Sequence, residues 1–207
     1  MSLKYAPVAA LLFVLALGCS KSNTGNTSSP ELFPNKVGDA WHYLVRDTTL
    51  SGNGVYPNTP YSADVRIVGI VKWPNGITAS IWQYKGPNWI DTNYVYQTGD
   101  TIRFMDVNNT IIVRQYIFPF TAGSSWPYIP GTSNVSVRGP EDIMVGNNSF
   151  AGAWEIYGNA GFPDVSFTIG HFFKEKIGFV RIYLNPSGEL ILTKHIVDWQ
   201  LVSWELK

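Results

Sequence analysis

The sequence has one cysteine, Cys19, so no disulfide can form within the chain and the fold must be held by packing. Charged residues make up 14% of the 207 residues, below the roughly 25% of typical soluble domains. The 15 basic and 15 acidic residues balance, which leaves no basic surface of the kind that binds nucleic acid. These shortages exclude a disulfide scaffold and a nucleic-acid-binding protein.

Motifs for catalysis and cofactor binding are also missing. No G-x-S-x-G or S-x-x-K motif supplies a nucleophile, and no glycine-rich phosphate loop joins a strand to a helix. The histidines His42, His171 and His195 lie far apart without metal-ligand spacing, so we expect them to be strand residues. We expect no catalytic residue, metal or cofactor, and hence no enzyme. A hydrolase is a minor alternative that depends on carboxylates pairing across strands: Glu141, Asp142, Asp164 and Glu175.

Aromatic residues are plentiful, with 8 Trp, 11 Tyr and 11 Phe. Together with many Thr and Val they favour β-structure. Within residues 63–71, Ala63, Val65 and Ile67 share one face, and the residues between them share the other. No window of the sequence predicts an amphipathic helix. The pattern predicts an all-β, or β-dominated, fold: an antiparallel meander that forms a strongly curved sheet or a half-open barrel.

The strands are expected between turn signals rich in Gly, Pro, Asn and Asp. Their predicted ranges are 41–47, 63–73, 78–84, 93–97, 101–106, 110–118, 133–137, 141–145, 151–157, 165–174, 179–184 and 190–206. The last range is long enough for one bent strand, or for two with a bulge near Asp198. No repeat of fixed period occurs, and no shift in composition follows Pro30. Residues 31–207 are therefore expected to form a single β-rich domain.

The first nineteen residues have the form of a bacterial export signal. Lys4 precedes an apolar run over residues 6–18, which is shorter than the about 20 residues that a membrane-spanning helix needs. Residues 15–19, LALGC, resemble the lipobox of bacterial lipoproteins, in which the cysteine is acylated and becomes the first residue of the mature protein. The resemblance implies that residues 1–18 are a removed signal peptide and that Cys19 carries acyl chains such as palmitate. The alternative is an ordinary signal peptide with a chance cysteine beside its cleavage point.

The residues that follow Cys19 suit a lipid-anchored protein. Residues 20–30, SKSNTGNTSSP, contain no large apolar side chain and predict a flexible tether, so that residues 19–30 form a lipidated N-terminus and its linker. Several acyl chains hold a protein firmly, because each buried methylene contributes about 0.8 kcal/mol. The resemblance to lipoproteins also implies that Ser20 favours the outer membrane. Whether the domain faces the periplasm or the cell surface stays open.

Four stretches, in order along the chain, resemble a known group. They are residues 32–43 (LFPNKVGDAWHY), 118–126 (FPFTAGSSW), 141–150 (EDIMVGNNSF) and 173–181 (FKEKIGFVR). Together they are similar to the DUF3108-like bacterial lipoproteins, many of them from Bacteroidetes-type bacteria. In the third stretch, Gly146, Asn147 and Asn148 replace the proline-alanine-glycine turn of that group.

This resemblance implies a curved antiparallel sheet, distantly like the lipoprotein carriers of the LolA and LolB type, and no particular activity. The matching residues also have a physical interpretation. Gly38 and Gly178 stand where the chain turns into a strand, a position that suits a positive φ. Trp41 and Tyr43 alternate on one face of a strand and are expected to anchor the core.

The aromatic residues in the middle of the chain are the candidates for ligand binding. Exposed Trp and Tyr rings stack on sugars or line apolar grooves, although a curved sheet also needs large residues in its hollow. Trp89 is the strongest candidate because it lies in a Gly/Pro turn. The candidates are Trp73, Trp82, Trp89, Tyr94, Tyr96 and Trp126.

The leading hypothesis is a non-catalytic lipoprotein, anchored by its N-terminal lipid to the outer membrane, whose domain binds an apolar or lipid-like ligand or a cell-envelope partner. The alternative is a glycan-binding accessory lipoprotein that uses exposed Trp and Tyr side chains. The sequence does not say whether the concave face of the sheet is filled or open.

Overall fold

The computed structural model describes residues 33–51, 54–162, 165–187 and 193–207. These residues form strands and turns, with no helix among them. The strands are β1 (Ala40–Ser51), β2 (Gly54–Pro57), β3 (Tyr61–Lys72), β4 (Thr78–Lys85), β5 (Ile90–Thr98), β6 (Thr101–Met105), β7 (Ile112–Ile117), β8 (Ser125–Pro127), β9 (Asn134–Val145), β10 (Asn148–Phe162), β11 (Val165–Lys174), β12 (Gly178–Ser187) and β13 (Thr193–Glu205).

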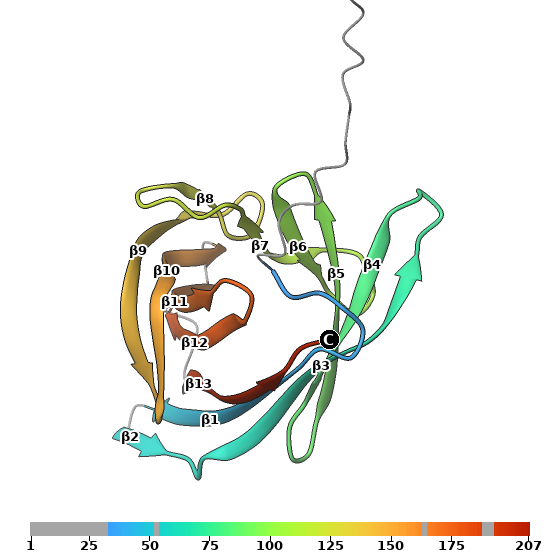
Figure 1. Cartoon of the computed structure of the whole chain (residues 1–207). Coiled ribbons are helices and arrows are strands. Elements are labelled where there is room, and N and C mark those ends of the chain that lie inside the picture. The colour runs from blue at the N-terminus through green and yellow to red at the C-terminus, as the bar shows by residue number, and fades with distance from the viewer. Residues whose placement is uncertain (1–32, 52–53, 163–164, 188–192) are drawn as a thin grey trace, which may run out of the picture.

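The strands form one antiparallel sheet in the order β7-β6-β5-β4-β3-β1-β13-β12-β11-β10-β9-β8, and β2 pairs with β1 outside this path. Most neighbours are consecutive in the chain, as in a meander. The exception joins the two ends of the domain, because Ala40 pairs with Glu205 and Ser51 with Thr193. Figure 1 shows the sheet curving into a ring. The predicted all-β, half-open barrel is confirmed.

The ring has one seam, where β7 faces β8. Gln115 bridges it: its backbone N–H donates to the Tyr128 carbonyl over 2.9 Å, and its side-chain Nε2 donates to the Pro127 carbonyl over 2.8 Å. In return, the Trp126 indole N–H donates to the Gln115 carbonyl over 2.8 Å. These bonds satisfy polar groups that a closed strand ladder would otherwise pair. The barrel is therefore nearly closed.

Aromatic side chains fill much of the ring. Trp41 and Tyr43 lie on the inner face of β1 and are 1% and 4% exposed. The Trp41 indole N–H donates to the Ile177 carbonyl (2.6 Å), and the Tyr43 hydroxyl donates to the Phe179 carbonyl (2.7 Å). The concave face of the sheet is thus largely occupied by side chains, with their polar tips hydrogen-bonded as buried Trp and Tyr require.

Two glycines adopt conformations that other residues rarely reach. Gly38 has a φ of 98° and Gly178 a φ of 103°. At Gly178, an added Cβ would stand 3.3 Å from the Trp41 indole nitrogen. Glycine at this turn therefore allows the β11–β12 connection to lie directly against the Trp41 ring.

One end of the barrel is closed by the segment that precedes β1, residues 33–39, which we call the N-terminal arm. Phe33 stacks on Trp82 and on Phe173, with ring centroids 5.5 and 6.0 Å apart. The carboxylate of Asp39 accepts hydrogen bonds from the backbone N–H groups of Lys36 (2.8 Å) and Lys207 (2.9 Å). Asp39 therefore ties the N-terminal arm to the C-terminus of the chain.

The predicted strands depart most from the structure in three places. Residues 133–137 and 141–145 belong to one strand, β9, because pairing with β10 resumes after a register shift around Gly139. The bulge of β13 lies at Val202, between the pairs His42–Ser203 and Tyr43–Leu201, and not near Asp198. Strands β2 and β8 were not predicted because four and three residues are too few to show an alternating pattern.

Candidate functional site

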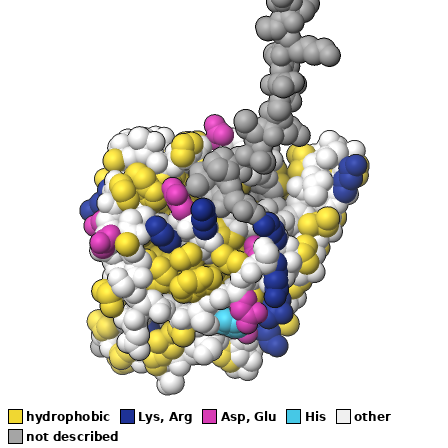
Figure 2. Space-filling model, in the orientation of Figure 1, with side chains coloured by type: hydrophobic (Ala, Val, Ile, Leu, Met, Phe, Trp, Pro, Cys, Tyr) yellow, Lys and Arg dark blue, Asp and Glu magenta, His cyan; other side chains and the backbone are white. Residues whose placement is uncertain are grey.

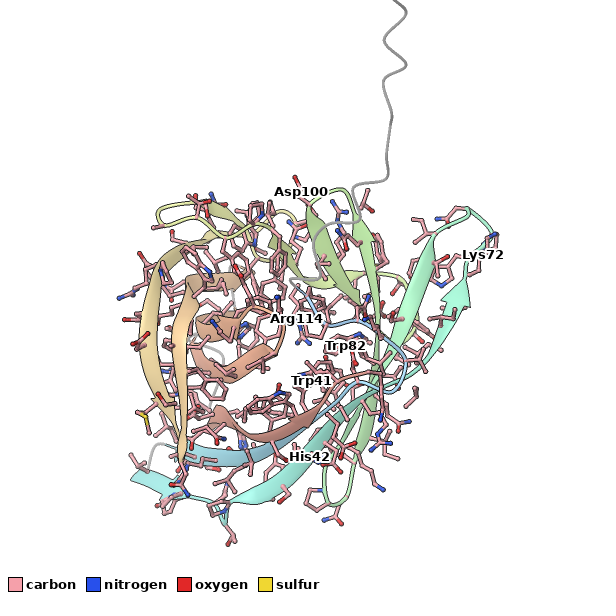
Figure 3. The ribbon with its side chains drawn as sticks, viewed as in Figure 1. Trp41, His42, Lys72, Trp82, Asp100 and Arg114 are labelled. Atoms are coloured by element: carbon pink, nitrogen blue, oxygen red, sulfur yellow. The ribbon has the colours of Figure 1, made fainter. Side chains whose placement is uncertain are left out.

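The main feature of the interior is an arginine. In β7, Arg114 alternates with Gln115, so it points inward on the same face as Tyr116. Figure 3 shows Arg114 inside the ring of strands together with Trp41 and Trp82. Its Nη2 donates to the Tyr84 hydroxyl over 2.6 Å, and its guanidinium carbon lies 4.2 Å from the centroid of the Phe104 ring.

This arginine lacks an anionic partner among the residues that the structure describes. No ion pair joins it to a carboxylate within that part of the chain. Its Nε is buried and has no hydrogen-bond partner there. A cation–π contact of this kind contributes about 0.5–2 kcal/mol, whereas an unpaired buried charge costs several kcal/mol. Arg114 is therefore an incompletely compensated cation.

Tyrosines surround Arg114 and are neutral at physiological pH. Burial raises the pKa of the Tyr84, Tyr116 and Tyr128 hydroxyls. Burial alone would lower the pKa of Arg114, but that pKa is raised overall, and the hydrogen bond to the Tyr84 hydroxyl contributes to the rise. The guanidinium thus stays charged while its neighbours offer only dipoles.

A pocket opens at each end of the barrel. The pocket beside the N-terminal arm has a volume of about 250 Å³, and the pocket lined by Arg114, at the other end, has a volume of about 160 Å³. Its apolar wall consists of Trp89, Trp199, Ile182 and Leu184. Its polar groups are Tyr84, Asp91, Asn93 and Arg114. A few convergent polar groups in an apolar pocket are typical of small-molecule sites.

Strand register places this pocket at the opposite end from the N-terminal arm. Strand β1 starts beside the arm at Ala40, and its later residue Val45 pairs with Trp199. Beyond Trp199, the turn between β4 and β5 carries Trp89. We call the two ends the arm end and the Trp89 end.

Trp89 folds back over its own turn at the mouth of the pocket. Its indole ring lies 6.1 Å from the ring of Trp199, centroid to centroid. A Cβ on Gly86 would stand only 2.2 Å from the Trp89 indole nitrogen. Gly86 therefore permits the position of Trp89, and Trp89 is half-buried there.

The three histidines lie in strands, and one of them is in the core. The Nδ1 of His171 lies 2.8 Å from the Tyr116 hydroxyl. Burial, with a smaller effect of Arg114, lowers the pKa of His171 to about 3, so the ring is neutral at physiological pH. His42 and His195 contact Asp64 and Asp47 over 2.6 and 3.2 Å. Across the described residues, no three or more His, Cys, Asp or Glu side chains are grouped so as to hold a metal ion.

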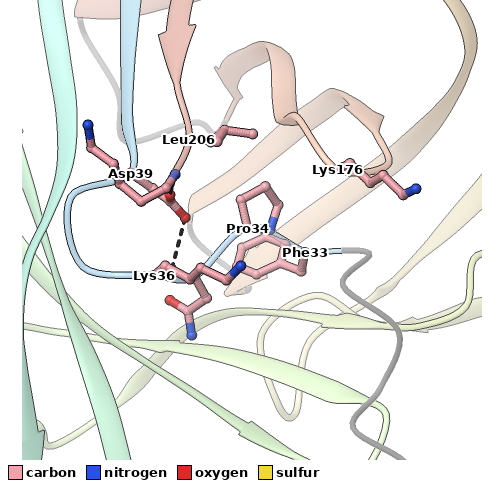
Figure 4. Close-up of a pocket in the computed structure, with 8 residues that line it drawn as sticks. Phe33, Pro34, Lys36, Asp39, Lys176 and Leu206 are labelled. Atoms are coloured by element: carbon pink, nitrogen blue, oxygen red, sulfur yellow. Dashed lines mark hydrogen bonds between the residues drawn. The ribbon is translucent and has the colours of Figure 1, made fainter.

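The pocket at the arm end, of about 250 Å³, is lined by the N-terminal arm itself. Figure 4 shows Phe33, Lys36 and Asp39 on one side, and Lys176 and Leu206 on the other. In Figure 2, which views this face, basic side chains lie beside hydrophobic ones. Because Phe33 packs into the aromatic core, this pocket does not continue into the ring.

The six aromatic candidates from the sequence fall in three places. Trp82 and Trp126 are buried core residues, 5% and 3% exposed, so neither is available as an exposed stacking surface. Trp73 contacts Tyr94 and Tyr96, with ring centroids 6.1 and 5.4 Å apart. These three are half-buried, and Tyr94 and Tyr96 alternate with the buried Val95, which puts them on the outer face of β5. Trp89 alone lies at the pocket of Arg114.

Sequence reasoning missed Arg114, Ile182, Leu184 and Trp199. A signal for Arg114 was present, because it shares a period-2 face with Tyr116 and Phe118 in an apolar run. That alternation places a charge among large apolar residues, but both faces of the run are mostly apolar, so it does not indicate which face is buried. The other three lie on β12 and β13, and only the register of these strands brings them to β4 and β7.

Some predicted residues lie outside the described part of the chain. Cys19, the segment 1–30 and Asp164 are among them. Of the other carboxylates, Asp142 accepts a hydrogen bond from the Gly152 backbone N–H over 2.8 Å, next to a bulge of β10. Within the described residues, no helix has the length and apolar character needed to cross a membrane.

Comparison with known proteins identifies no family for this chain. No family model and no curated protein matches the chain. Among solved structures, the chain is distantly similar to a LolA superfamily protein, NE2245 from Nitrosomonas europaea, with 10% identity and a TM-score of 0.23 over 86% of this chain and 89% of the other. A likeness this weak carries no argument about function, and the resemblance to the DUF3108-like group stays a prediction.

Proposed function

We propose that this chain is a non-catalytic lipoprotein, anchored to the bacterial outer membrane, whose β-barrel binds an apolar or lipid-like ligand at the Trp89 end. In this proposal residues 1–18 are removed, Cys19 is acylated and residues 19–30 form a tether. Membership of the DUF3108-like group is part of the same proposal.

The observation that carries the binding function is the pocket beside Arg114. Its walls combine two tryptophans, Trp89 and Trp199, with Ile182 and Leu184. Burial of apolar ligand surface here is favourable by about 25 cal/mol per Å². Because Phe33 and the aromatic core fill the arm end, the ligand would enter from the Trp89 end.

The geometry of the chain also suits a tethered receptor. Phe33, the first described residue, lies at the arm end of the barrel. A tether that ends there would leave the barrel opposite the Arg114 pocket. In the proposed arrangement the tether and the pocket are therefore at opposite ends of the barrel.

Anchoring is tested by the Cys19→Ser substitution. Membrane fractionation of cells that produce the wild-type chain should recover it with the outer membrane, and the variant should be unprocessed or soluble. Attachment of the variant to the outer membrane would overturn the anchoring part of the proposal.

Ligand binding is tested by native mass spectrometry of residues 19–207 with Cys19→Ser, which lacks the acyl chains. After incubation with a total lipid extract, we expect a bound apolar molecule. The matched control Leu184→Trp fills the pocket and should lose that mass. An unliganded spectrum of the Cys19→Ser chain would contradict the binding function.

A second candidate function is glycan binding. It is favoured by the contact of Trp73 with Tyr94 and Tyr96 on the outer face, since exposed aromatic rings stack on sugars. Tryptophan fluorescence of the wild-type chain and of Trp73→Ala, titrated with a panel of polysaccharides, tests it. Wild-type fluorescence that ignores the panel would contradict it.

A further inference from the structure

We propose that the ligand of the Trp89-end pocket is a monocarboxylate with an apolar body, and that Arg114 binds its carboxylate. This inference rests on the proposed function and adds the chemical class of the ligand. It follows from three observations: the unpaired guanidinium, the composition of the pocket wall, and the acidic residue at the rim.

The guanidinium is the first observation. One of its nitrogens, Nη2, is used by the Tyr84 hydroxyl, while Nε is buried and unpartnered among the described residues. A carboxylate takes two parallel hydrogen bonds from a guanidinium edge. An incoming carboxylate would therefore neutralise a charge that the tyrosines leave uncompensated.

The ring of Phe104 holds the guanidinium plane in place. The guanidinium carbon of Arg114 lies 4.2 Å from the centroid of that ring. The Tyr84 hydroxyl accepts from Nη2, and its own proton is still able to be donated to a ligand oxygen. The donors are thus positioned before the ligand arrives, which reduces the entropy lost on binding.

The wall of the pocket determines the rest of the ligand. Trp89, Trp199, Ile182 and Leu184 present apolar surface next to Arg114. The pocket, about 160 Å³, is smaller than the roughly 300–1,000 Å³ of pockets that enclose drug-sized ligands. It therefore holds the carboxylate and the first part of the apolar body, while the remainder lies across the mouth beside Trp89.

Asp91 at the rim limits the charge of the ligand. It lines the same pocket and affects the hydroxyl of Tyr84 electrostatically. Among the described residues that line the pocket, Arg114 is the one cation and Asp91 the one anion, so the second charge of a dianionic head, such as an alkyl phosphate, would have no counter-charge there. The site is therefore expected to prefer a single negative charge.

The test compares ligands of equal length that differ in their head group. Residues 19–207 with Cys19→Ser are titrated with decanoate, decan-1-ol and decyl phosphate below their aggregation limits, and tryptophan fluorescence is followed. We expect decanoate to bind about tenfold more tightly than the alcohol, the value of one charge-assisted hydrogen bond, and more tightly than the phosphate.

Arg114→Met should reduce the preference for decanoate over decan-1-ol to about one and leave alcohol binding intact. Should that variant not fold, the ratio of the wild-type affinities for decanoate and decan-1-ol decides. Leu184→Trp, which fills the pocket, should weaken the binding of both ligands. Equal binding of decanoate and decan-1-ol by the wild type would overturn the carboxylate assignment but not the proposed function. Tighter binding of decyl phosphate would also overturn it. Binding of none of the three would overturn the proposed function itself.

Discussion

The two ends of the barrel differ in whether their buried polar groups have hydrogen-bond partners. Both combine large aromatic rings with polar groups taken out of water. At the arm end the polar groups have partners inside the chain: Asp39 accepts from Lys36 and Lys207, and the Asn35 side chain accepts from Trp82. At the Trp89 end, the Nε of Arg114 has none among the described residues.

This difference indicates which end of the barrel stabilises the fold and which end is available to bind a ligand. A buried polar group with a partner contributes to folding, whereas one without a partner costs free energy. A buried polar group without a partner, such as that of Arg114, can still bind a ligand at its end of the barrel. The arm end is therefore the structural end of the molecule, and we expect substitutions to act on folding at one end and on binding at the other.

The largest effect is expected for Trp41→Ala beside the arm end. Trp41 is 1% exposed, stacks on Trp82 with centroids 4.9 Å apart and donates to the Ile177 carbonyl. Its loss should lower the free energy of unfolding by about 3–5 kcal/mol, measured by urea denaturation. The matched control Trp89→Ala, in the half-buried turn, should cost far less. Equal losses at the two positions would remove the distinction between the ends.

The next effect concerns the connection between the N-terminal arm and the C-terminus. Asp39→Ala leaves two backbone N–H groups, those of Lys36 and Lys207, without their acceptor. We expect a loss of about 2–3 kcal/mol in urea unfolding. An unchanged unfolding midpoint would show that the N-terminal arm does not depend on this carboxylate.

Acid should destabilise the core through His171. The pKa of this histidine is lowered to about 3 in the folded protein, mainly by burial, and is about 6.5 in the unfolded chain. Between these values the unfolded state binds a proton that the folded state does not, so stability falls as the pH drops from 6.5 towards 3. The contribution is up to about 1.4 kcal/mol per pH unit.

The check is urea unfolding at several pH values with His171→Gln. This variant should show a shallower decline than the wild type below pH 6.5, because the proton uptake by the unfolded chain is removed. Parallel curves for His171→Gln and the wild type would contradict the assignment.

The smallest effect is expected on the outer face. Arg181 and Asp198 form a two-bond ion pair of 2.8 and 3.0 Å, partly exposed to solvent. Such pairs contribute about 1 kcal/mol or less. Asp198→Asn should therefore change the urea midpoint only slightly and leave ligand binding unchanged. A loss as large as that of Trp41→Ala would mean that the outer ion pair stabilises the fold as much as core packing does.

Much of the fold could be predicted because strands alternate with a period of two. Ala63, Val65 and Ile67 form the buried face of β3 as their spacing predicts. Where alternation is short or interrupted, prediction failed: β8 has three residues, and the bulge of β13 lies at Val202 because pairing with β1 shifts there. Local patterns do not specify such register shifts.

The candidate site was harder to predict than the fold. Trp89 could be selected because a Gly/Pro turn exposes its residues. Trp199 and Leu184 could not, because the pairing of distant strands, β1 with β13, determines what faces Arg114. Trp82 illustrates the reverse: it belongs to the same aromatic-rich region as Trp89 but is a buried partner of Phe33 and Trp41.

We infer that Arg114 is held for a ligand and not for the fold. The most direct measurement is the free energy of unfolding of Arg114→Met without ligand, because replacing an uncompensated buried charge by an apolar side chain is often neutral or stabilising. We expect a variant at least as stable as the wild type, with decanoate bound no better than decan-1-ol. A variant destabilised by several kcal/mol would show instead that Arg114 is a structural residue, held for the fold.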